Sequence, residues 1–187
     1  MKFLLITMAA VFLLFTSCGI PIDVDGSTKS EIKPAYTCLP GLIDDNIPNS
    51  IKQNIYSSIT NSVNNMFDKM KKELDKQDTS LTSEVKLTKL IMKQLEIPTT
   101  KKDSNTLGMI KSLKVFIMFK GGDSRTLLAE VINNPSLSTK IDFKLIDKDI
   151  YSYLKKGAEI EIKDLTIRDC PKETIKIEVS YTATATL

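Results

Sequence analysis

Apolar residues recur at spacings of three and four between Ile51 and Leu74, which predicts a long amphipathic helix. Ile47-Pro48 favours a helix start, because proline suits the first helical turn. We therefore expect a helix over about 47–76, roughly 40 Å long. Its stripe indicates packing on the rest of the domain; the alternative is a helix that binds a partner or lies on a membrane. The stripe consists of Ile51, Ile55, Ile59, Val63, Met66, Met70 and Leu74.

Beyond the helix the apolar period changes to two, which predicts β-strands. The alternating segments are 83–90, 113–119, 126–132, 141–145, 160–167 and 175–187. Leu90 to Leu95 fits either a continued strand or a short helix. Residues 149–156 fit a short helix that Gly157 ends, and Lys163-Asp164 interrupts the following strand, which indicates a β-bulge.

A helix followed by strands contains no repeated strand-helix-strand unit, so a doubly wound parallel sheet is not expected. The order predicts an α+β fold, in which the long N-terminal helix packs on a mainly antiparallel β-sheet or β-sandwich of about six strands. We expect residues 38–187 to form a single globular domain, a length that suits one core. Residues 18–37 contain Gly, Pro, Ser, Thr and Asp with little periodicity and are interpreted as a lipidated tether.

The start of the chain has the features of an export signal. Lys2 precedes an apolar run, Phe3 to Leu14, that is shorter than the roughly 20 residues needed to span a bilayer. Phe15-Thr16-Ser17-Cys18 follows and resembles the lipobox of bacterial lipoproteins, with Phe15 where leucine is usual. The alternative is an ordinary secretory signal that leaves Cys18 as a thiol.

The lipoprotein resemblance implies that residues 1–17 are a cleaved signal peptide and that Cys18 carries a diacylglyceryl group and a further acyl chain such as palmitate. This covalent lipid is the only non-protein group that we expect, and it would anchor the chain to a membrane of the bacterial cell envelope. Gly19 replaces the aspartate that resembles an inner-membrane retention signal. Because the aspartate is absent, we expect the lipid anchor in the outer membrane and the domain in the periplasm.

Composition excludes several kinds of site. The chain has no histidine, which excludes Ser-His-Asp and Cys-His nucleophiles and histidine metal sites. The net charge of +3 is not clustered, so nucleic-acid binding is not expected. An exported chain with two remaining cysteines favours a Cys38–Cys170 disulfide over two buried thiols. We predict no catalytic residues and no metal site, and therefore a protein that is not an enzyme.

Two segments are alternative sites for chemistry. The first is an acidic interval that comprises Asp142, Asp147, Asp149, Glu159, Glu161 and Asp164. A glycosidase needs paired carboxylates in a cleft, but several of these residues alternate with apolar ones and are interpreted as the solvated face of a strand. The second is Gly121-Gly122-Asp123-Ser124-Arg125, which is interpreted as a hairpin turn in preference to an anion site.

The strand block 85–187 resembles immunoglobulin-like and late-embryogenesis-abundant-type sandwich lipoproteins in its order of elements. We expect a non-catalytic binding or structural module of the cell envelope, which contacts the membrane through its lipid and an envelope protein through its surface. One alternative is a carrier of a lipid or other apolar ligand between helix and sheet. A second alternative is a periplasmic inhibitor or immunity lipoprotein.

Overall fold

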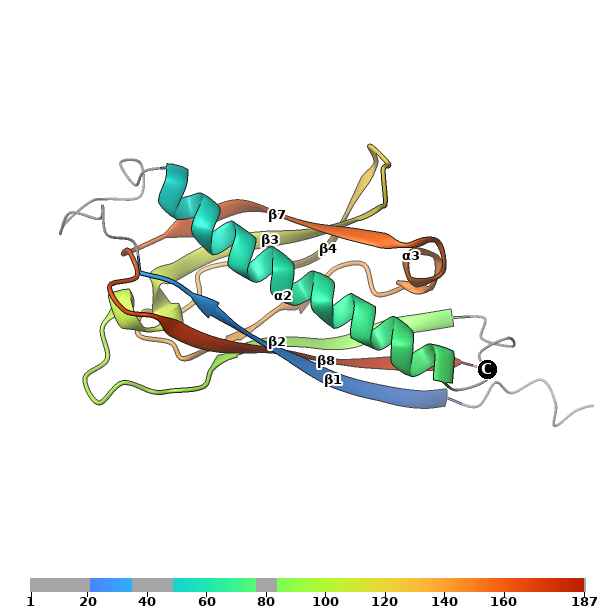
Figure 1. Cartoon of the computed structure of the whole chain (residues 1–187), viewed down its shortest axis with the longest axis horizontal. Coiled ribbons are helices and arrows are strands. Elements are labelled where there is room, and N and C mark those ends of the chain that lie inside the picture. The colour runs from blue at the N-terminus through green and yellow to red at the C-terminus, as the bar shows by residue number, and fades with distance from the viewer. Residues whose placement is uncertain (1–20, 35–48, 77–83, 187) are drawn as a thin grey trace, which may run out of the picture.

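In the computed structural model, which describes residues 21–34, 49–76 and 84–186, one long helix packs on two four-stranded antiparallel sheets (Figure 1). The first sheet has the order β1-β8-β2-β5, from Pro21–Ile32, Ile175–Thr186, Glu84–Gln94 and Lys140–Asp142. The second sheet has the order β6-β4-β3-β7, from Lys144–Leu145, Arg125–Val131, Ile110–Phe119 and Ala158–Ile167. The helices are α2 (Asn49–Lys76) and α3 (Tyr151–Lys156), with 3-10 turns η3 (Asp103–Asn105) and η4 (Leu107–Met109). The predicted α+β sandwich-like fold is confirmed.

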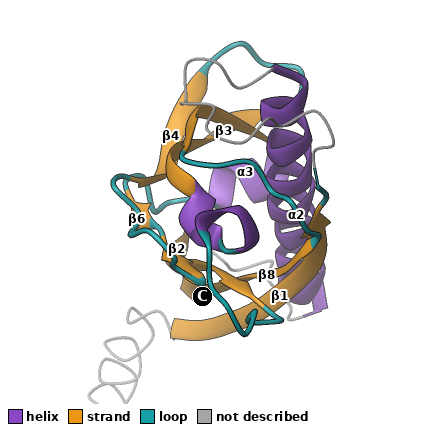
Figure 2. Ribbon diagram, turned by 90° about the vertical axis from the view of Figure 1, so that its left-hand side faces the viewer, coloured by secondary structure: helices purple, strands orange, loops and turns teal. Residues whose placement is uncertain are grey.

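Helix α2 covers the side of the sandwich where β1 and β7 are the edge strands (Figure 1 and Figure 2). Its predicted apolar stripe is buried, and Ile55, Ile59 and Val63 have no exposed surface. A 28-residue helix is about 42 Å long, and a 12-residue strand such as β8 is about 40 Å long. The helix therefore runs along the whole sandwich. None of the described helices is both long and apolar enough to cross a bilayer.

The interpretation of residues 18–37 as a tether is wrong for Pro21–Ile32, which form β1. This strand pairs antiparallel with β8 along its full length, from Pro21 opposite Thr186 to Ile32 opposite Ile175. The folded domain therefore includes residue 21 and does not begin at residue 38. Residues 140–145 are also divided into two strands, so the described ranges contain eight strands where about six were expected.

The apolar alternation of β1 is interrupted at the positions where it meets its neighbours most closely. A Cβ atom at Gly26 would lie 2.5 Å from the hydroxyl of Tyr181, so only glycine leaves room for that ring. The hydroxyl of Thr28 donates a hydrogen bond of 2.9 Å to the carbonyl of Ser62 in α2. Ser30, on the same face, shares a hydrogen bond with the hydroxyl of Ser62. Three of the inward-facing positions are therefore not apolar, which weakens the strand pattern.

The side of the sandwich opposite α2 is closed by a segment that changes sheets. Strand β5 pairs with β2 in the first sheet, and β6, two residues later, pairs with β4 in the second. Phe143 lies buried at the crossing. The chain then returns, since the N–H of Ile150 donates to the carbonyl of Val85 at 2.9 Å. Strands that change sheets in this way form the corners of closed sandwiches.

Two local predictions in the strand region are confirmed. Gly121 has φ of +72° in the turn between β3 and β4, where the N–H of Gly122 donates to the carbonyl of Phe119 at 2.8 Å. The register of β3 with β7 shifts near Asp164, whose φ is +51°, and this is the expected bulge. The ambiguous residues after Leu90 continue β2 as far as Gln94.

A hydrogen-bond network joins three loops at the end of the sandwich where β1 finishes. The carboxylate of Asp103 accepts from the hydroxyl of Ser136 and from the N–H of Leu137, the latter at 2.7 Å. The guanidinium of Arg168 donates to the carbonyls of Gly108 and Asn134, at 2.8 and 2.5 Å. These bonds fix loops that are distant in sequence.

Candidate functional site

A surface groove of about 630 Å³ lies between α2 and the edge strand β7, and is called the α2–β7 groove. Hydroxyl and amide side chains from the helix line one side, and the middle of the strand lines the other. The lining residues are Gln53, Tyr56, Ser57, Thr60 and Asn61 from α2 and Ile160–Asp164 from β7. Gln53, Ser57 and Asn61 are exposed, so the groove opens to solvent on its helix side.

Side chains of α2 bound the groove at both ends by bonding to the edge of β7. The N–H of Ile160 donates to Oδ1 of Asn64 at 3.0 Å. The N–H of Leu165 donates to the hydroxyl of Tyr56 at 3.2 Å. Asn64 lies eight residues after Tyr56, a distance of about 12 Å along the helix, which is the length of about four residues of strand.

Between these two contacts, the main chain of β7 presents hydrogen-bonding groups to the groove. In an antiparallel pair, opposed residues alternate between those that bond each other and those whose groups point away. Ile160, opposite Ile117, sends its N–H outward to α2, so Ile162, opposite Val115, does the same. Of the hydrogen bonds that the described residues form outside the sheet ladders, none comes from the N–H of Ile162. The groove therefore contains an unpaired stretch of sheet edge.

The charged residues of the groove are paired with one another and with the second sheet. Glu161 forms ion pairs with Arg125 and, at 3.4 Å, with Lys163. Asp164 forms an ion pair of 2.8 Å with Lys114, and its hydrogen bond raises the pKa of that lysine. The carboxylates are thus engaged, and the remaining lining side chains suit hydrogen bonds to a neutral partner.

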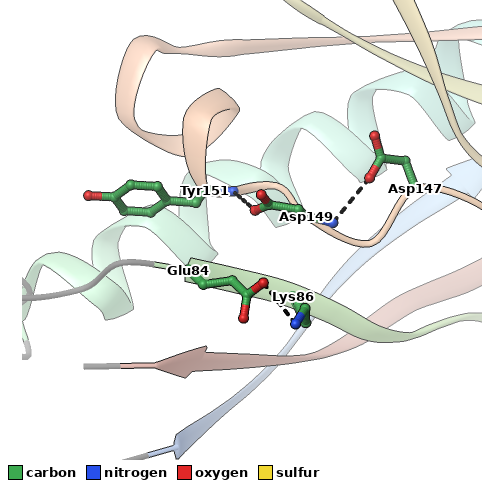
Figure 3. Close-up of polar contacts among 5 residues, drawn as sticks. All are labelled: Glu84, Lys86, Asp147, Asp149 and Tyr151. Carbon is green, nitrogen blue, oxygen red and sulfur yellow. Dashed lines mark hydrogen bonds and ion pairs between the residues drawn. The ribbon is translucent and has the colours of Figure 1, made fainter. Parts of the chain in front are cut away.

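The rest of the acidic interval is distributed over β5, β7 and the turn before α3. Asp142 pairs with Lys140 at 2.8 Å. Asp147 and Asp149 each accept a main-chain N–H two residues ahead, at 3.2 and 3.1 Å, and thereby order the turn before α3 (Figure 3). Glu159 lies on the outward face of β7, as expected. Within the described ranges, no three acidic or cysteine residues form a group that could hold a metal ion.

The predicted lipidation and disulfide sites lie mostly beyond the reach of the structure. Cys18 and Cys38 are outside the described residues. Cys170 is buried, with 3% of its surface exposed, just before β8. The Cys38–Cys170 bridge and the lipid on Cys18 therefore stay predictions.

Two further depressions lie elsewhere on the surface. One of about 470 Å³ is lined by residues 130–135 with β5 and β6, and one of about 400 Å³ lies on the outer face of the first sheet. Polar and charged side chains predominate in the second, including Lys89, Lys93 and Glu178. Between α2 and the sheets, Ile59, Met66 and other apolar side chains are buried in the core, and the carrier alternative stays a prediction.

Sequence reasoning missed the α2–β7 groove. Ser57 and Asn61 were interpretable only as the solvated face of an amphipathic helix, and the edge position of β7 cannot be predicted from its own residues. The bulge at Lys163-Asp164 was the one local signal, because bulges often lie beside binding sites.

Comparison with protein-family models and with curated protein sequences finds no match to this chain. Its function is therefore argued from the residues and geometry described above.

Proposed function

We propose that this chain is a lipid-anchored, non-catalytic binding module of a bacterial cell envelope, and that the α2–β7 groove binds an extended segment of a partner protein. The observation that carries the proposal is the outward-facing, unpaired N–H of Ile162 in an open groove. A partner's main chain can add to such an edge, with hydrogen bonds that supply affinity.

The lining of the groove supports a peptide partner. Ser57, Thr60 and Asn61 offer donors and acceptors opposite the edge of β7, so an inserted main chain would find partners on both sides. The bonds from Asn64 and Tyr56 restrict pairing with β7 to about four residues. An inhibitor or immunity lipoprotein would be a special case of this function.

The anchor is tested first. Fatty-acid labelling of cells that express the full chain should mark the protein, and Cys18→Ala should abolish the label and leave an uncleaved precursor. Normal labelling of the variant would contradict the proposed anchor.

The groove is tested with a matched pair of variants. Asn61→Arg places a long cation in the groove, whereas Asn65→Arg places the same group one turn away, on an exposed position outside the lining. A photo-crosslinker at Ser57 should capture one envelope protein in cells, and Asn61→Arg should reduce this product strongly while Asn65→Arg should not. Equal effects of the two variants, or no product at Ser57, would overturn the proposal.

A further inference from the structure

Strand β1 begins so close to Cys18 that the anchor and the domain have almost no spacer between them. Two residues separate Cys18 from Pro21, the first residue of β1. Three extended residues reach about 10 Å, whereas the sandwich is about 40 Å long, as judged from β1. We propose that the end of the sandwich at which β1 begins lies directly against the bilayer surface, with phospholipid headgroups as its partner. This inference rests on the proposed lipid at Cys18.

The register of the first sheet defines this membrane-facing end. Pro21 pairs with Thr186, and Thr186 also pairs with Glu84, the first residue of β2. The C-terminal end of α2 and helix α3 lie at the same end of the molecule (Figure 1). The membrane-facing end therefore includes the start of β1, the start of β2, the end of β8, the C-terminal end of α2, and α3. The end of β3 and the start of β7 adjoin α3 there.

The charges at this end suit lipid phosphates. Exposed lysines lie in the last two turns of α2 and in the last turn of α3, and comprise Lys71, Lys72, Lys76, Lys155 and Lys156. The neighbouring carboxylates are largely engaged, since Glu73 pairs with Lys76 and Glu84 pairs with Lys86, both at 2.7 Å (Figure 3 shows the second pair). Asp23, Asp75 and Asp149 are also exposed at this end, and none of them forms an ion pair with a described residue. The exposed lysines of this end are therefore available to lipid phosphates, although they share it with these carboxylates.

The orientation places the α2–β7 groove away from the membrane. Its helix residues lie between Gln53 and Asn61, in the half of α2 that is remote from Lys76. The loop network of Asp103 and Arg168 lies at the far end of the sandwich. A partner would therefore reach the groove without competition from the bilayer.

Lysine footprinting of the acylated full chain tests the orientation. The protein is reconstituted in vesicles of phosphatidylethanolamine and phosphatidylglycerol, and flotation with the vesicles establishes the anchor independently of its orientation. An amine-reactive reagent and mass spectrometry then compare Lys72 and Lys155 with Lys101 and Lys172, which are exposed at the far end. We expect several-fold slower modification of the first pair in vesicles, relative to the second pair.

A spacer variant provides the control. Insertion of about 20 Gly/Ser residues between Ile20 and Pro21 gives a flexible link of about 25 Å. Flotation should persist, while the difference between the two pairs of lysines should shrink towards none. If the chain without the insertion floats with the vesicles and its two pairs of lysines react equally fast, the inference is overturned. A chain that does not float would instead contradict the proposed anchor.

Discussion

At the scale of single residues, the loop network at the far end of the sandwich depends on the absence of one side chain. The carbonyl of Gly108 accepts from Arg168, and its Cα faces the loop that contains Leu137. A Cβ atom there would lie 2.3 Å from the main-chain nitrogen of Leu137 and 2.6 Å from Oδ1 of Asp103. Neither atom can move away at low cost, because the N–H of Leu137 donates a hydrogen bond to Oδ1 of Asp103.

Gly108→Ala should therefore destabilise the domain by about 1–3 kcal/mol, the usual range for an overpacked site. Gly121→Asn is the matched control, since Gly121 has φ of +72° and open space around it, and asparagine tolerates that conformation. Denaturant unfolding measures both. A smaller loss for Gly108→Ala than for Gly121→Asn would contradict the packing described for this end.

A second residue-scale prediction concerns acid stability. The ion pair with Lys93 lowers the pKa of Glu178 below its ordinary value of 4.5, against the opposing effect of burial. The pair therefore stabilises the fold above pH 4.5, and this contribution is lost as the pH falls through the lowered pKa.

Glu178→Gln should lower stability at pH 7 by up to about 1 kcal/mol and flatten the loss of stability on acidification. Glu173→Gln, at an exposed position in the turn before β8, should change neither the stability at pH 7 nor its loss on acidification. Melting temperatures between pH 3 and about pH 7 check this, because the window spans the titration of a paired carboxylate. An unchanged acid slope for Glu178→Gln would count against the ion pair.

At the scale of elements, the accuracy of sequence-based prediction depended on how regular each apolar pattern was. Helix α2 and most strands from β2 onward were predictable, because one face of each element is buried and repeats with its own period. The division of 140–145 between the two sheets was not. Strand β1 was not predictable either, since Gly26 and Thr28 replace apolar residues on its inward face. Their reasons, the ring of Tyr181 and the carbonyl of Ser62, lie far away in sequence.

Substitutions in β1 test the correction to its assignment. Ile32 has no exposed surface, so Ile32→Ala should destabilise the domain by about 2–5 kcal/mol. Glu31, its exposed neighbour, should tolerate the same change within about 0.5 kcal/mol. Chemical denaturation measures both, and equal tolerance at the two positions would restore the tether interpretation.

Helix α2 gives the corresponding prediction for the apolar stripe. Ile59→Ala should cost about 2–5 kcal/mol, because Ile59 is fully buried against the sheets. Asn65→Ala, at an exposed position, serves as the control. If melting were unchanged and self-association were lost instead, the stripe would serve a partner and not the domain's own core.

At the scale of the whole molecule, the sandwich is closed on one side by α2 and on the other by the segment that changes sheets. Such closure depends on contacts between distant parts of the chain, which no local pattern predicts. The same is true of the α2–β7 groove, which exists only because residues near Ser57 and near Ile162 meet. Sequence reasoning could therefore reach the class of fold but not the candidate site.

The predicted Cys38–Cys170 disulfide is a further whole-molecule constraint. It would close a loop of more than a hundred residues, for which chain-entropy models give about 4–5 kcal/mol. Thiol labelling in denaturant, followed by peptide mapping, should find neither cysteine labelled without reductant, and reduction should lower the melting temperature. Labelling of both residues without reductant would refute the bridge.

The position of β8 determines when this fold can form. Among the described strands β8 comes last in the chain, yet it lies between β1 and β2 in the first sheet. Neither of those strands has its main partner until residues 175–186 have been synthesised, and the β1–β8 pairing spans most of the sequence. Topologies dominated by such distant pairings fold slowly, in about milliseconds to seconds, and expose unpaired edges while they wait. The first sheet of the nascent chain would therefore remain incomplete, and open to chaperones, until β8 has been synthesised.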